Sequence, residues 1–170
     1  MDVSKAVKER RSIRSFLKKD IPEDIVHKLI DALIWAPSAG NLQSRKFYFV
    51  KDEKLKKQIA SAALGQEFIT EAPVVIVGCA DSKIGHHYGQ RGIELYSIQD
   101  VSVSIMAMML VAYENGLGTC WVGAFREEEV SRILNLPGNL RPVAIVPAGF
   151  PARIPKPTSR VSGEEAVIFS

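Results

Sequence analysis

The stretch PVVIVGCA at residues 73–80 constrains the fold more than any other part of this 170-residue chain. Its valines and isoleucine follow one another without the polar alternation of a half-exposed strand, which predicts a central strand buried on both faces. A chain of this length can bury a sizeable core within one domain, which we expect to span residues 1–170. Any fold for this sequence must therefore place protein on both sides of its sheet.

Helical and strand patterns alternate irregularly around this strand. Apolar spacing predicts a first helix over residues 3–10, a second between Pro22 and Pro37, and a third over residues 55–62. The longest helix, residues 95–115, is apolar on most faces, which is typical of a core helix or an oligomer interface. Further strands are predicted at KFYFVKD and RPVAIVPAGF, and a short helix at REEEVSRILNL. This irregular order predicts an α+β fold.

The charge balance excludes one class of partner. The chain has 22 basic and 19 acidic residues, and a net charge of +3 is too small for non-specific binding to nucleic acid. Cys79 and Cys120 each sit in an apolar run and are expected to be buried and reduced. The N-terminus lacks an apolar signal core, and the apolar stretch SIMAMMLVAY is shorter than the roughly 20 residues of a membrane span. We expect a cytoplasmic protein with no membrane partner.

Three arginines crowd into the stretch RRSIRSF, residues 10–16. If the chain runs extended after the first helix, Ser12 and Arg14 face the same way. Arg10, on the last helical turn, can converge with them. Two guanidinium groups and a hydroxyl suit a phosphate dianion, because arginine donates bidentate, charge-assisted bonds. Alternatively, the arginines only complement the dipole at the helix end.

The stretch APSAGNLQSRKF, residues 36–47, ends a helix with small residues and then offers Ser38, Asn41 and Gln43. Small side chains let a flat ligand approach the backbone, and amide groups can pair with the edge of a heterocycle. An ordinary helix-ending loop would use similar residues.

The stretch NGLGTCWVGAF, residues 115–125, ends the longest helix at Gly116 and Gly118. After it, Gly123 and Ala124 would leave backbone N–H groups uncovered and able to donate to a ligand. The alternative is a capped helix followed by a turn.

The C-terminal tail, IPKPTSRVSGEEAVIFS, combines a proline-rich arm with an apolar end. The prolines keep residues 154–158 extended and out of any strand ladder. The terminal AVIF is then expected to form a strand that pairs with a sheet edge, either its own or a partner's.

Taken in order, ERRSIRSF, APSAGNLQ, IQDVSVSIMAM, GLGTCWVGAF and VPAGFP resemble the FMN-dependent nitroreductase family over nearly the whole chain. The resemblance implies an α+β, nitroreductase-like fold with a central mixed or antiparallel sheet flanked by helices. It also implies a homodimer with FMN at the subunit interface, in which each C-terminal arm is exchanged with the partner.

The resemblance also implies the residues that contact FMN. Arg10 and Ser12 would hold the phosphate, and Arg14 would lie near the ribityl chain and pyrimidine O2, where a cation stabilises reduced flavin. The loop from Pro37 to Asn41 would reach the flavin from the other subunit, and the Gly123 backbone would face N5. The full implied set is Arg10, Arg11, Ser12, Arg14, Pro37, Ser38, Ala39, Asn41, Gln66, Gly123, Ala124 and Arg160.

The implied activity is NAD(P)H oxidation by ping-pong hydride transfer through flavin N5 to nitroaromatics, quinones or similar electron-poor acceptors. The sequence has no G-x-G-x-x-G after a strand, and in this family none is needed. We expect no catalytic side-chain nucleophile, and no metal site, because the adjacent His86 and His87 rarely face one ion. The alternatives are a specialised flavin enzyme (flavin-consuming, dehalogenating or ring-oxidising) and a flavin-binding protein without turnover.

The chain departs from the family pattern in two places. Many relatives carry an aromatic residue in the segment after Asn41 and Gln43, where this chain has Arg45 and Lys46. Many also carry a helical insertion over the flavin, whereas only DSKIGHHYGQRG, residues 81–92, precedes the longest helix here. Such a small lid implies an open site with Tyr88 and Arg91 as candidate substrate contacts, unless this segment is only a solvated loop.

Overall fold

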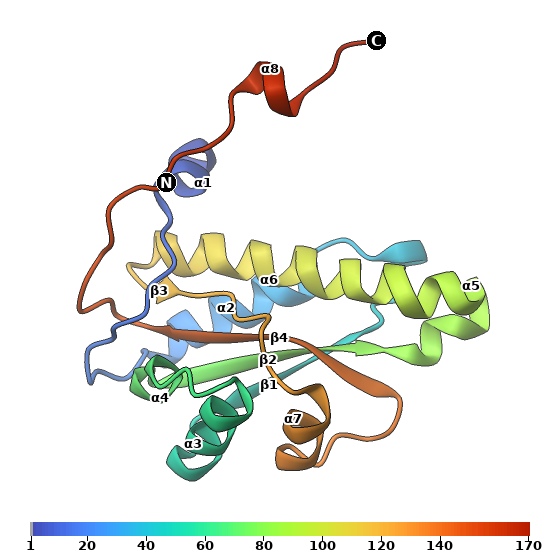
Figure 1. Ribbon diagram of the computed structural model, residues 1–170, viewed down its shortest axis with the longest axis horizontal. Coiled ribbons are helices and arrows are strands. Elements are labelled where there is room, and N and C mark those ends of the chain that lie inside the picture. Colours follow the sequence, from blue (N-terminus) through green and yellow to red (C-terminus); the bar gives the residue numbers. More distant parts are fainter. Residues whose placement is uncertain (1) are drawn as a thin grey trace.

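The central strand, β2 (Val74–Asp81), lies inside a four-stranded antiparallel sheet with the order β1-β2-β4-β3. The computed structural model describes residues 2–170 (Figure 1). Every residue of β2 before Asp81 is buried, as the sequence predicts. Its neighbours are β1 (Arg45–Val50) and β4 (Leu140–Gly149), and the short β3 (Gly118–Thr119) pairs with β4 at one edge.

Helices cover both faces of the sheet (Figure 1). α2 (Glu23–Trp35) and α6 (Ser97–Glu114) pack on one face, where Val74 and Ile76 meet them. On the other face, Val75 and Val77 pack against α3 (Glu53–Ala62) and α7 (Glu127–Ile133), and α4 (Phe68–Glu71) adjoins α3. The α+β class and the flanked sheet are confirmed, and the sheet is antiparallel rather than mixed.

The segment before the longest helix is helical rather than a loop, although residues 86–91 are solvent-exposed as the loop alternative expected. η2 (Ser82–Ile84), α5 (Gly85–Arg91) and the π-helical turn η3 (Gly92–Tyr96) lead into α6, with a kink at Gly89, whose φ is 57°. By length and a mean hydropathy of 1.5, the run Ser82–Glu114 could cross a membrane. In this fold, however, α6 packs between α2 and the sheet, as a core helix does.

The N-terminal segment crosses the sheet edge after α1 (Val3–Glu9). The Ile13 N–H donates to the Thr119 carbonyl at 2.9 Å. A Cβ built on Gly118 would lie 2.4 Å from the Ile13 side chain, so only glycine leaves room for this crossing. The arginine-rich stretch is thereby fixed beside β3.

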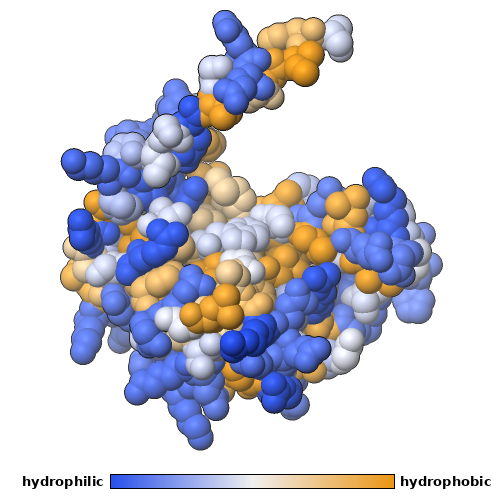
Figure 2. All heavy atoms as spheres, in the orientation of Figure 1, coloured by the Kyte–Doolittle hydropathy of each residue, from blue (hydrophilic) through white to orange (hydrophobic). Residues whose placement is uncertain are grey.

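The C-terminal arm, residues 152–170, lies exposed on the outside of the chain (Figures 1 and 2). It contains one short helix, α8 (Gly163–Ala166), and it ends with Ile168 and Phe169, whose side chains are 90% and 95% exposed. The terminal AVIF forms no strand with its own chain, because Ala166 is helical and residues 167–170 pair with no strand. A strand on a partner's sheet edge stays a prediction.

Candidate flavin site

Arg10 is the clearest candidate for binding an anion. It follows α1 directly, and its backbone N–H closes the helix on the Ala6 carbonyl at 3.0 Å. Its guanidinium Nε and Nη1 are buried and have no hydrogen-bond partner among residues 2–170. Buried donors are almost always paired in native proteins, so two unpaired donors on one cation indicate a missing anionic acceptor.

Arg11 behaves differently from Arg10. Its Nη1 donates to the carbonyls of Lys8 and Arg10, both at 2.8 Å, at the end of α1. Arg11 therefore follows the alternative in which an arginine only complements the helix end, because its side chain satisfies terminal carbonyls of α1.

Ser12 and Arg14 converge with Arg10 around the thiol of Cys120. Burial raises the pKa of Cys120, while the Arg14 charge, a Ser12 hydrogen bond and the Arg10 charge partly oppose the rise. All three residues thus act on one thiol, and their convergence on a phosphate stays a prediction. The Arg14 guanidinium also lies 5.8 Å from the ring centre of Phe68.

The thiols themselves are poor nucleophiles. Both cysteines are free and buried, as expected, and burial raises the pKa of Cys79 to about 12. A thiol with a raised pKa is almost wholly protonated at neutral pH, so neither cysteine supplies a thiolate.

The loop after α2 adopts a conformation that few residues tolerate. The 3₁₀ turn η1 (Ala39–Asn41) contains Gly40 at φ 55° and Asn41 at φ 56°, and Gln43 follows at φ 52°. The Ser38 Oγ accepts from the Gln43 N–H at 3.0 Å, which closes the loop on itself. Left-handed backbone outside glycine stores strain and is common where a loop is shaped for a ligand.

Two further elements support this loop. Arg45, at the start of β1, is buried, and its guanidinium bonds the carbonyls at the end of α2. From α5, the Tyr88 hydroxyl lies against Gly40, at 2.5 Å from the position of a Cβ built there. Sequence reasoning treated Arg45 only as a departure from the family, because nothing local in SRKF shows that this cation is buried.

The glycine turn after β3 carries the exposed Gly123 and Ala124. Their backbone N–H groups donate to no acceptor among residues 2–170. The Gln66 Nε2 donates to the Ala63 carbonyl at 2.9 Å and to the Ala124 carbonyl at 3.1 Å. Gln66 therefore positions this turn, and its amide is occupied by backbone contacts.

Arg160 lies on the exposed C-terminal arm. Its Nη1 donates to Thr158 Oγ1 at 2.6 Å and to the Ser159 carbonyl at 2.8 Å. These contacts hold the guanidinium within the arm. One chain thus brings together the N-terminal arginines and the glycine turn region, but not Arg160.

Comparison with known proteins assigns the family. The model of the nitroreductase family matches residues 7–66 and 60–150. The chain belongs to the nitroreductase family. A NADH dehydrogenase of Thermus thermophilus, 31% identical, aligns with 99% of this chain and 96% of its own length. An FMN reductase [NAD(P)H] of Bacillus subtilis is 32% identical over 89% of this chain and 66% of its own length.

The structural comparison agrees with the nitroreductase assignment. The NADPH:FMN oxidoreductase of Vibrio harveyi, solved with NAD⁺, superposes with a TM-score of 0.91 over 98% of this chain and 76% of its own. At 23% identity this likeness shows the fold alone. As a nitroreductase, the chain is an oxidoreductase with the fold that the sequence motifs imply.

Proposed function

We propose that this nitroreductase is an FMN-dependent NAD(P)H oxidoreductase that reduces nitroaromatics, quinones or similar electron-poor acceptors by ping-pong turnover. The observation that carries the proposal is the pair of buried, unpartnered donors on Arg10. FMN offers them a phosphate with nearly two negative charges, and the relatives' names supply the NAD(P)H requirement.

The residues present fit this cofactor. Arg10 and Ser12 would bind the phosphate, because Arg10 has two buried donors without a partner and the Ser12 hydroxyl follows two residues later in the segment that crosses to β3. Arg14 would place its permanent charge near the pyrimidine end of the ring. The free N–H groups of Gly123 and Ala124 would donate toward the reacting edge.

Bound FMN would supply the redox chemistry, namely acceptance of hydride from NAD(P)H and delivery of electrons to an electron-poor acceptor. The chain's own contribution is to bind, orient and shield. Its cations would favour the more negative, reduced form of the cofactor, and the loop Ala39–Asn41 would contact the cofactor bound at the subunit interface. No side chain needs to act as a nucleophile, in keeping with the protonated thiol of Cys120.

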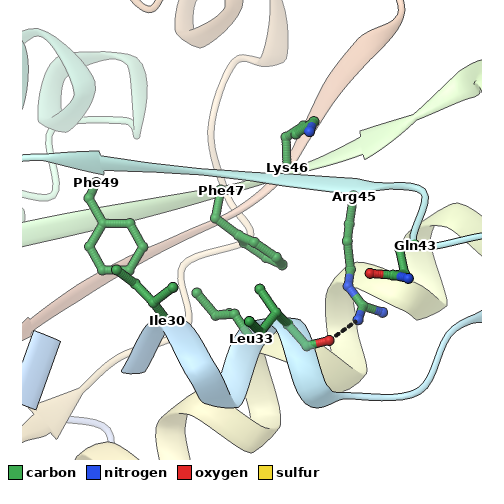
Figure 3. Close-up of a pocket in the computed structure, with 8 residues that line it drawn as sticks. Ile30, Leu33, Gln43, Arg45, Lys46, Phe47 and Phe49 are labelled. Carbon is green, nitrogen blue, oxygen red and sulfur yellow. Dashed lines mark hydrogen bonds between the residues drawn. The ribbon is translucent and has the colours of Figure 1, made fainter. Parts of the chain in front are cut away.

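We further propose a cytoplasmic homodimer in which each arm lies on the partner. β1 is an edge strand, and beside it Ile30, Phe47 and Phe49 line a groove of about 400 Å³ (Figure 3). Trp35 is 85% exposed at the end of α2. The open edge of β1 exposes unpaired backbone groups, and the arm exposes apolar side chains. Dimerisation would cover both. Arg160 would then reach the phosphate of a site that it does not reach in the single chain.

The experiment is a visible spectrum of the purified full-length protein, recorded before and after anaerobic addition of NADH or NADPH. We expect a flavin spectrum that bleaches with at least one pyridine nucleotide and returns with a quinone. Dithionite serves as the control, because it reduces bound flavin whatever the nucleotide preference. A colourless protein that ignores added FMN would refute the cofactor. Flavin that only dithionite bleaches would favour a specialised flavin enzyme or a non-catalytic flavin protein.

A further inference from the structure

Arg45 binds the end of α2 from beneath the Pro37–Asn41 loop. Its side chain leaves β1 and turns toward the last carbonyls of the helix (Figure 3). It is 6% exposed and donates to the carbonyl oxygens of Ile34 at 3.2 Å, Ala36 at 2.6 Å and Pro37 at 2.9 Å. One guanidinium thus satisfies acceptors that every helix end leaves unpaired, in a place that water reaches poorly.

Asp100, in the first turn of α6, binds the same loop with the opposite charge. Its Oδ1 accepts from the Ala39 N–H at 2.9 Å, and the residue is 3% exposed. Its Oδ2 is buried and has no partner among residues 2–170. Burial lowers the pKa of Arg45, and the charge of Asp100 opposes that shift. The two side chains thus bind the loop from different elements, Arg45 from β1 and Asp100 from α6.

We propose that Arg45 and Asp100 are positioning residues for the loop that contacts the cofactor. This role rests on the proposed function, because it requires that the loop contact a bound flavin. Arg45 fixes the carbonyl of Pro37 and Asp100 fixes the N–H of Ala39, so both sides of Ser38 are held. The left-handed residues that follow are strained and relax toward other conformations once these anchors are lost.

The pairing of the two charges makes a specific prediction about combined variants. Removing one member of a buried pair leaves the other charge uncompensated, and removing both does not. We therefore expect Arg45→Met and Asp100→Asn together to disturb the loop less than the sum of the single changes. Arg45→Lys keeps the charge but cannot bind three carbonyl oxygens in the same geometry. We expect it to retain part of the loop protection and of the FMN affinity that Arg45→Met loses.

The matched control is Lys56, another buried cation bound to backbone. It is 2% exposed, donates to the Ala72 carbonyl at 2.8 Å and pairs with Glu53 at 2.7 Å. Lys56→Met removes a cation of similar burial without touching a residue assigned to the flavin. Any loss common to Lys56→Met and Arg45→Met is therefore a general loss of stability.

The experiment measures two quantities on each full-length variant. Amide hydrogen exchange over residues 36–43 of flavin-free protein reports the loop itself, and quenching of FMN fluorescence gives the Kd. We expect Arg45→Met to speed exchange in this loop selectively and to weaken FMN roughly 10- to 100-fold, as the loss of charge-assisted bonds implies. Lys56→Met should leave both quantities near the wild-type values.

The outcomes separate this proposal from the one on which it rests. If Arg45→Met leaves loop exchange unchanged, or frees the loop without changing the FMN Kd, the positioning role is wrong while the flavin assignment stands. Equal losses in Arg45→Met and Lys56→Met also refute it. If wild-type protein binds no FMN, the proposed function fails, and the positioning role fails with it.

Discussion

Replacement of Arg10 by alanine should move apo stability and FMN affinity in opposite directions. In the single chain, Arg10 Nε and Nη1 are buried without a partner. A buried unpaired donor costs about 1–3 kcal/mol of stability, and its removal recovers part of that cost. Lost contacts of the alkyl chain oppose the gain. We expect the free energy of unfolding of the apo protein to stay unchanged or to rise by up to about 2 kcal/mol.

The same change removes the guanidinium group that would bind the FMN phosphate. A charge-assisted hydrogen bond contributes about 1.5–3 kcal/mol, which corresponds to a Kd for FMN about 10- to 150-fold weaker. Because the stabilisation by a ligand grows with the logarithm of its affinity, excess FMN should protect the variant less by that same amount, roughly 1.5–3 kcal/mol. A residue retained for binding despite its cost to stability is a common trade-off at functional sites.

The assay is urea unfolding with and without excess FMN, together with a fluorescence titration of FMN. Arg141→Ala is the matched control: it also lowers the net charge of +3 by one, but Arg141 pairs with Glu127 at 2.8 Å instead. If Arg10→Ala destabilises the apo protein like a core mutation and leaves the FMN Kd at the wild-type value, the reasoning from unpaired donors is refuted. An equal loss of FMN affinity in Arg141→Ala would show that the lower net charge, and not a binding site at Arg10, weakens FMN.

Three further predictions test other parts of the structure. Gly118→Ala should push Ile13 aside and weaken FMN binding by displacing the arginine segment, and an unchanged Kd would show that the crossing tolerates a side chain. Truncation after Pro157 should shift the protein toward monomer in sedimentation and release flavin, whereas a flavin-loaded dimer would contradict arm exchange. Arg141 lowers the pKa of Glu127, so this pair stabilises the fold above the unfolded-state pKa and loses that effect as pH falls through the folded-state value. Because the pair is partly exposed, the difference between wild type and Glu127→Gln in urea unfolding should be below about 1 kcal/mol at pH 7, and it should vanish only once the pH lies below the lowered folded-state pKa.

Local sequence patterns were sufficient for the main elements. The unbroken run in β2 predicted a strand covered on both faces, and Pro22 and Pro37 bracketed α2. These signals depend on backbone geometry over a few residues, which the chain carries wherever it folds. The resemblance of five ordered motifs also predicted the family, which the family model confirms.

The same local reading was wrong where the outcome depends on neighbours. α5 is helical instead of a loop, and it kinks at Gly89 before the chain continues into α6. The final AVIF forms no strand with its own chain, and a strand there requires an edge that only a partner would supply.

The sequence by itself determined the layered sheet, the boundaries of the long helices and the set of cations available to bind a phosphate. Only the tertiary structure decided what each cation does: Arg10 is left with unpaired donors, Arg11 ends α1, and Arg45 holds a loop together with Asp100. All three arginines carry the same charge in the sequence. Their roles differ because burial and the position of backbone carbonyls are fixed by segments that lie far apart along the chain.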